Sequence, residues 1–146
     1  MFLLNISESS FIIRICNIDP ILLIQIFALL FLAILFLQSG SDKVFDWKGN
    51  LEWLKAHFAN SILAKIVPLS LGIITFVELA AGLFSAIGAL NILVGNSNFA
   101  AFIGVSLSNL ALLMLFFGQR IAKDYAGAGA LVPYFILSLA TLYILA

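Results

Sequence analysis

The sequence predicts an all-α polytopic membrane protein: a bundle of four transmembrane helices, with an amphipathic interfacial helix between the first and second spans. Of its 146 residues, 64% are hydrophobic and only 10% are charged, and the mean hydropathy is +1.20. Soluble domains are about half apolar and a quarter charged. A soluble fold of this size would therefore leave much apolar surface in water. Four apolar runs also approach the ~20 residues that span a bilayer as a helix.

The four predicted spans cover residues 21–37, 67–94, 99–117 and 128–145. Pro20 precedes the first of them and suits the first position of a helix. A cleaved signal peptide is the alternative for this first run. No compact basic stretch precedes the run and no Ala-x-Ala-like site follows it, so we expect a span. Only four residues, 95–98, separate the second and third spans, which predicts a tight turn.

Two segments are expected along the chain. Residues 20–146 form the four-helix membrane domain. Residues 1–19 form an apolar N-terminal extension that Glu8, Arg14 and Asp19 interrupt, and it is either interfacial or poorly ordered.

The long connection, residues 38–66, carries the pattern of an amphipathic helix. Its apolar residues recur at spacings of three and four: Leu51, Leu54, Phe58, Ile62 and Ile66. Asn50 is the predicted N-cap. We expect this helix to lie at the membrane interface, with Trp47 and Trp53 at headgroup level. A helix that is merely packed against the bundle explains the pattern equally well.

The basic residues predict the orientation. Six of the seven lie in two connections, residues 38–66 and 118–127, and the seventh is Arg14. The positive-inside rule places both connections in the cytoplasm and both termini outside. Arg120, Lys123 and Asp124 are expected to anchor the second connection at the interface, or to shape a cavity mouth together with Pro133. The formal net charge of zero suggests no nucleic-acid partner.

Glu78 is the most informative residue because it lies near the middle of the second span. An ionisable group at that depth costs about 2.5 to 3.5 kcal/mol on insertion scales and normally faces the bundle interior. Small residues on the same helix favour close approach of a neighbouring helix. The predicted helix-packing residues are Gly40, Ala81, Gly82, Ser85, Gly88 and Ala89.

Several side chains are candidate partners of this carboxylate. Asn109, with Ser106 and Ser108, lies in the third span, and Ser138 and Thr141 lie in the fourth; all can form hydrogen bonds. Gln38 and Lys43 follow the first apolar run. Lys43 reaches Glu78 if the first helix continues unbroken past Gly40; otherwise its side chain extends to the lipid headgroups.

The rest of the composition excludes several kinds of site. The single cysteine, Cys16, rules out an internal disulfide, and with one histidine, His57, the chain lacks the ligands of a bis-histidine haem or a His/Cys zinc site. No nucleophile–base pair and no phosphate-binding glycine loop is visible. We therefore expect no metal, no covalently held cofactor and no self-contained catalytic site, which leaves open whether the protein belongs to an enzyme.

The order of these features resembles the DoxX/DoxD-like family of small bacterial membrane proteins. The similarity rests on "FLQSGSDKVFD", with Gly40 and Lys43, and on "ELAAGLFSAIG", with Glu78, Gly82 and Gly88. It covers about residues 20–146. The resemblance implies a four-helix bundle in the bacterial inner membrane and an association with redox metabolism. Relatives include the membrane subunit of a thiosulfate:quinone oxidoreductase. A related branch that handles disulfides uses cysteine pairs, which this chain lacks.

Two functions are compatible with the sequence. One is an accessory or quinone-facing subunit of a membrane redox complex, in which a protein partner supplies the redox centre. The other is a non-catalytic scaffold within a larger assembly or homo-oligomer. Glu78 is accordingly a ligand or proton site, a structural contact between helices, or a group paired with another subunit.

Overall fold

The computed structural model describes residues 19–146, and all regular structure in this part of the chain is helical. The elements are α2 (Pro20–Phe45), α3 (Trp47–His57), the short 3-10 helix η1 (Ala64–Ile66), α4 (Val67–Leu93), α5 (Phe99–Ile121) and α6 (Tyr125–Leu145). Four helical segments are long and apolar enough to cross a membrane: α2, η1 with α4, α5 and α6. These confirm the predicted class, a multi-pass membrane protein with a short helix between the first two spans. The predicted N-terminal extension, except for Asp19, lies outside the described residues.

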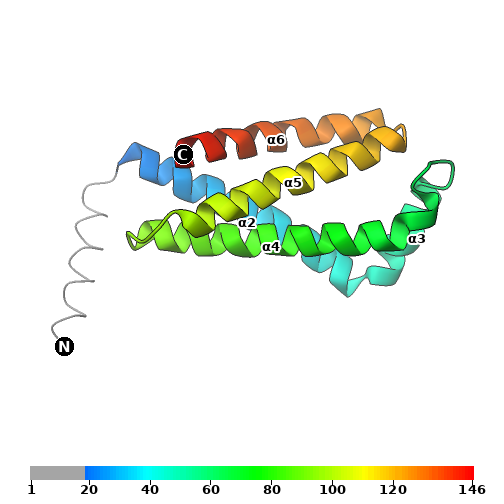
Figure 1. The fold of residues 1–146 in the computed structure, drawn as a ribbon, viewed down its shortest axis with the longest axis horizontal. Coiled ribbons are helices and arrows are strands. Elements are labelled where there is room, and N and C mark those ends of the chain that lie inside the picture. The colour runs from blue at the N-terminus through cyan, green and yellow to red at the C-terminus, as the bar shows by residue number, and fades with distance from the viewer. Residues whose placement is uncertain (1–18) are drawn as a thin grey trace.

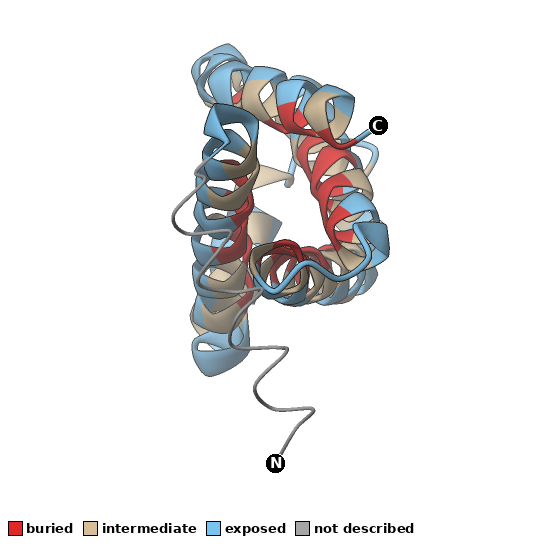
Figure 2. Ribbon diagram, turned by 90° about the vertical axis from the view of Figure 1, so that its left-hand side faces the viewer, coloured by how far each residue is buried: buried red, intermediate tan, exposed pale blue. Residues whose placement is uncertain are grey.

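The four long helices form an antiparallel bundle. α4 packs against both α2 and α5, α5 packs against α6, and α6 also contacts α2 (Figure 1). The buried residues face the inside of this ring of helices (Figure 2). α3 lies at one end of the bundle, beside the α5–α6 turn and away from the C-terminus.

Glycines allow α2 and α4 to approach each other closely. A Cβ atom added at Gly40 would lie 2.7 Å from Cδ2 of Leu79, and one added at Gly82 would lie 2.8 Å from the backbone nitrogen of Leu37. Real Cβ atoms essentially never come this close: at Gly82 the backbone of α2 would have to move, whereas at Gly40 the Leu79 side chain would have to shift. The same kind of contact joins α4 to α5, where Gly88 packs against Ala101 and Gly104 against Ser85. All the predicted packing residues are buried: Gly40, Ala81, Gly82, Ser85, Gly88 and Ala89.

α2 is longer than the apolar run from which it was predicted. It begins at Pro20, as expected, and the Asp19 side chain caps it by accepting a 3.0 Å hydrogen bond from the Ile21 amide. The helix does not stop at residue 37 but continues to Phe45, through Gly40. Ser39 and Lys43 therefore lie one helical turn apart on the same face.

The helix predicted in the long connection is present, but it begins and ends earlier in the chain than predicted. α3 begins at Trp47, and its N-cap is Asp46, whose carboxylate accepts from the Gly49 amide at 3.1 Å. Asn50 lies inside the helix and is not the cap. α3 ends at His57, and in the turn that follows the Ser61 hydroxyl donates to the Phe58 carbonyl at 2.8 Å. Ile62 and Ile66 consequently lie outside α3.

The two short turns differ in their backbone geometry. The predicted turn between the second and third spans is confirmed, and Gly95 adopts a φ of 81° there. The last helix begins at Tyr125, three residues before the apolar run, with Asp124 as its N-cap at 2.8 Å from the Gly127 amide. Lys123, just before it, has a φ of 62°, which is unfavourable for a residue with a Cβ. Pro133 lies within α6 without ending it.

Candidate functional site

Glu78 and Lys43 form an ion pair inside the bundle. Nζ of Lys43 lies 2.9 Å from Oε2 and 3.2 Å from Oε1 of Glu78. The Glu78 side chain is completely buried, and that of Lys43 is 16% exposed. Attraction between the charges offsets part of the cost of removing both from water, because little solvent screens them at this site. The continuation of α2 beyond Gly40 is what brings the two residues together.

Ser39 completes this site, although it was not among the predicted partners of Glu78. Its hydroxyl donates to Oε1 of Glu78 at 3.1 Å and accepts from Nζ of Lys43 at 2.8 Å. Its carbonyl also accepts from the same ammonium at 3.2 Å. The sequence signal for this contact is the spacing of four residues between Ser39 and Lys43, which places both on one face of a helix. These three residues, which we call the ion-pair site, form a continuous hydrogen-bonded chain from lysine to carboxylate.

Three of the other predicted partners of Glu78 bond within their own helices, and the buried Ser138 hydroxyl has no hydrogen-bond partner among the described residues. The Asn109 amide donates to the carbonyl of Val105, in its own helix, at 3.0 Å. Ser108 and Thr141 likewise bond to carbonyls one turn earlier, at 2.8 and 2.7 Å. Gln38 is exposed on α2. The structure therefore brings Lys43, but not Gln38 or the Asn109 amide, into hydrogen-bond contact with Glu78.

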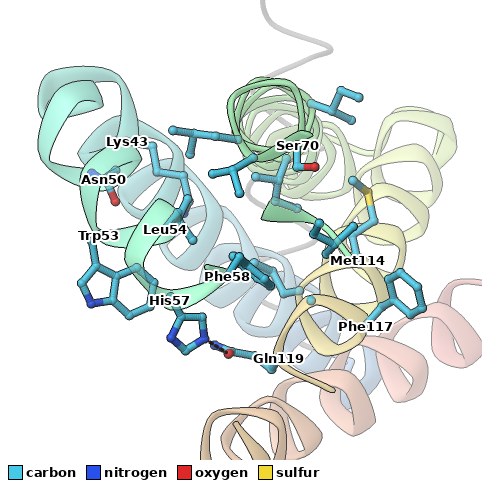
Figure 3. Close-up of a pocket in the computed structure, with 17 residues that line it drawn as sticks. Lys43, Asn50, Trp53, Leu54, His57, Phe58, Ser70, Met114, Phe117 and Gln119 are labelled. Atoms are coloured by element: carbon cyan, nitrogen blue, oxygen red, sulfur yellow. Dashed lines mark hydrogen bonds between the residues drawn. The ribbon is translucent and has the colours of Figure 1, made fainter. Parts of the chain in front are cut away.

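A pocket of about 420 Å³ opens beside the ion-pair site, between α3, the start of α4 and the end of α5 (Figure 3). Lys43 belongs to both the pocket and the ion-pair site. Most of the wall is apolar, and the polar side chains in it are Lys43, Asn50, His57, Ser70, Gln119 and the indole of Trp53. None of the described residues that line it is acidic. A pocket of this size and composition suits a small amphipathic ligand.

The far side of the pocket carries a second polar contact that sequence reasoning missed. Nε2 of His57 lies 3.0 Å from Oε1 of Gln119 and so joins α3 to the end of α5. The imidazole stacks on Trp53, with ring centroids 4.7 Å apart and an angle of 15° between the planes. His57 and Gln119 are 62 positions apart in the chain. No local sequence pattern connects them.

The predicted interfacial residues lie at the same end of the bundle as the pocket. Trp47 and Trp53 are 39% and 58% exposed. The Arg120 guanidinium lies 4.7 Å from the centre of the Tyr125 ring, a cation–π contact, and Lys123 is exposed. Asp124 serves as the α6 cap described above.

No protein-family model, curated protein or solved structure matches this chain. The structure shows the general class of the protein and not its family: it is a small membrane protein with four spanning helices. The DoxX/DoxD-like resemblance stays a prediction.

Proposed function

We propose that this protein binds a membrane-dissolved quinone in the pocket beneath α3 and acts as an accessory, quinone-facing subunit of a membrane redox complex. The observation that carries the proposal is the position of Lys43, which lines the pocket while its ammonium is held 2.9 Å from the buried carboxylate of Glu78. An apolar pocket that ends at a buried ion pair is expected to be a functional site rather than a filled core.

The lining chemistry supports a ligand whose headgroup accepts hydrogen bonds. The indole of Trp53 and the amide of Gln119 offer donors, whereas the Lys43 ammonium is held by Ser39 and Glu78 and the Asn50 amide by the carbonyls of Asp42 and Asp46. A quinone presents two carbonyl oxygens and an apolar tail. A cationic ligand would find no counter-charge in the lining.

The route into the pocket also favours a lipid-soluble molecule. Ile73 on α4 and Phe117 on α5 line the pocket and are 47% and 60% exposed. In a bilayer these residues contact lipid. A tail can therefore leave the pocket between α4 and α5 without crossing water.

Glu78 would then handle protons for the bound headgroup. The hydrogen-bonded chain from Lys43 through Ser39 to Glu78 connects the pocket to a carboxylate shielded from water. A redox-active partner protein would supply electrons. The DoxX/DoxD-like resemblance supports the same assignment, and with it a bacterial inner-membrane location and cytoplasmic basic connections.

Quinone binding by the purified protein tests this proposal. A short-chain quinone should quench the fluorescence of Trp53, which lines the pocket, and should raise the melting temperature of the wild type because it binds the folded state. Glu78→Gln should weaken binding measured per folded molecule, because the loss of the charge also destabilises the protein. Glu52→Gln, an exposed acid on α3, is the matched control and should bind as wild type does.

Two results would oppose the proposal. Absence of both quenching and thermal stabilisation in the wild type would exclude a quinone site. A Glu78→Gln variant that binds normally per folded molecule but is produced in low yield would make Glu78 a structural contact between helices.

A non-catalytic scaffold is the second candidate, and the outer face of α6 favours it. Ala126, Gly129, Ala130 and Pro133 are exposed at helical spacing, and a Cβ added at Gly129 would meet nothing within 4 Å. Small residues on a lipid-facing helix allow another helix to approach. Gly129→Leu should abolish co-purification of a stoichiometric partner if this face is the contact, and should leave quinone binding unchanged.

A further inference from the structure

α3 forms one wall of the pocket but is not part of the packed core of the bundle. None of its 11 residues is buried, whereas each of the four spanning helices contains buried residues. Asn50, Trp53, Leu54 and His57 of α3 nevertheless line the pocket, together with Phe58, which follows the helix (Figure 3). A displacement of α3 would therefore remove one wall of the pocket and leave the core of the bundle intact.

The N-terminal end of α3 is held by hydrogen bonds to the end of α2. The backbone amide of Asp46 donates to the Asp42 carbonyl at 3.0 Å, and the Asn50 side chain donates to the Asp42 and Asp46 carbonyls at 3.4 and 2.8 Å. Asp46 has a non-helical backbone, with φ −118° and ψ 54°, and it is the single residue between the two helices. Such a residue at the end of an element can absorb the dihedral changes of a hinge.

The C-terminal end of α3 is fastened to α5 by a hydrogen bond between side chains. Nε2 of His57 lies 3.0 Å from Oε1 of Gln119, and within residues 19–146 no other side-chain hydrogen bond joins α3 to α4, α5 or α6. Gln119 is fixed on the side of the bundle, because a Cβ added at Gly127, in the first turn of α6, would lie 3.0 Å from its Cδ. The neighbouring contact, between the Phe58 ring and Gly118, is apolar.

We infer that α3 is a lid on the pocket: it turns about Asp46, and the His57–Gln119 hydrogen bond, which we call the latch, holds it closed. When the latch breaks, the wall formed by α3 moves away from α4 and α5. One hydrogen bond changes such an equilibrium by about three- to tenfold. This inference goes beyond the proposed function, because the lid controls access to the pocket for any ligand.

Thiol labelling measures the opening of the lid without a ligand. In a Cys16→Ser background, Ser70→Cys places a thiol on α4 in the pocket lining. Ser138→Cys places one in the buried interior of the bundle, outside the pocket lining, where it reports opening of the bundle itself. The reagent is fluorescein maleimide, which is bulky and water-soluble, and the protein is kept in detergent. If the lid recloses faster than the thiol reacts, the labelling rate is proportional to the open population.

Two variants break the latch from opposite sides. Gln119→Leu should speed labelling of the Ser70→Cys thiol about three- to tenfold. His57→Phe, which keeps an aromatic ring against Trp53, should have the same effect. The double variant should label no faster than either single variant, because both substitutions remove the same bond.

Gln25→Leu is the matched control. The Gln25 side chain donates to the Ile144 carbonyl at 2.9 Å and so joins α2 to α6, outside the pocket lining. This substitution also removes a glutamine hydrogen bond between helices, but it should leave labelling of the Ser70→Cys thiol unchanged. The Ser138→Cys thiol should react at the same rate in the presence and absence of either latch substitution.

Two results would overturn the inference. One is a labelling rate at the Ser70→Cys thiol that neither Gln119→Leu nor His57→Phe changes. The other is an equal increase at the two thiols, which would assign the effect to loosening of the whole bundle. If one latch variant fails to fold, the other still tests the same bond. A wild type that binds no quinone would overturn the proposed function but not the lid, because the labelling uses no quinone.

Discussion

At the scale of single residues, the bundle interior holds an ion pair between Lys43 and Glu78. Glu78 is fully buried, so its charge depends on the ammonium at 2.9 Å and on the Ser39 hydroxyl. Within the described residues Oε2 accepts no hydrogen bond and is held only by the charge of the ammonium. Removing one member of such a pair leaves the other charged and poorly solvated, which costs more than the pair itself contributes.

Lys43→Met is therefore expected to lower the free energy of unfolding by about 3 to 5 kcal/mol. Adding Glu78→Gln should recover part of this loss, because the uncompensated charge disappears. Unfolding in mixed detergent and SDS, followed by circular dichroism, measures both variants and the double mutant. Losses that simply add would contradict a direct interaction between the two residues.

At the scale of helices, close contacts at glycine set the distances within the bundle. Gly82 lies against the backbone of α2, whereas Gly129 faces open space on α6. The two glycines share helical geometry and differ in what surrounds them. They form a matched pair for testing whether packing or helix propensity decides stability.

Gly82→Ala should destabilise the protein by about 1 to 3 kcal/mol, since the new methyl group forces α2 and α4 apart. Gly129→Ala should be neutral or stabilising by up to about 1 kcal/mol, because alanine is the better helix former. Thermal unfolding in one detergent compares them. Equal effects at the two positions would contradict the close α2–α4 contact.

The α5–α6 turn gives a second prediction at this scale. Lys123 has a φ of 62°, where a Cβ is disfavoured by about 1 to 2 kcal/mol. Lys123→Gly should raise the free energy of unfolding by up to about 1 kcal/mol, because the unfolded glycine is also more flexible. Lys123→Ala removes the charge but keeps the strain. A stabilising effect of the alanine variant would instead assign the gain to charge.

At the scale of the whole molecule, four antiparallel spans put the connections at alternate ends. α3 and the α5–α6 turn lie at one end, and the turn at residues 94–98 lies at the other (Figure 1). All basic residues of the described chain lie at the α3 end. The orientation rule predicts that this end, with the pocket, faces the cytoplasm.

Cysteine labelling in intact cells tests this orientation. In a Cys16→Ser background, Ser97→Cys should react with an impermeant maleimide from outside. Glu52→Cys on α3 should react only after permeabilisation. The reverse pattern would place the pocket on the outer face, and the stability predictions above would be unaffected.

The amino-acid sequence by itself determined the class of protein and the burial of Glu78. An apolar run of spanning length predicts a membrane helix from hydropathy alone. An acid within such a helix must face the protein interior, whatever residue it pairs with. It also determined Pro20 as the start of α2 and the short turn before α5. The helix in the long connection was less predictable, because its start is set by the side chain of Asp46, which caps it at Gly49, and not by the spacing of its apolar residues.

Only the tertiary structure decided which polar groups meet. Lys43 was one of several candidate partners of Glu78, and it became the partner because α2 continues past Gly40 and packs closely on α4. Asn109 bonded within its own helix instead. The pocket and the His57–Gln119 contact join segments far apart in the chain. Helical periodicity gives the face of a helix on which a side chain lies. Which side chain it meets on a neighbouring helix depends on where each helix ends, on the angle at which the helices cross and on how far along the bundle each residue lies, and these are set only when the helices pack together.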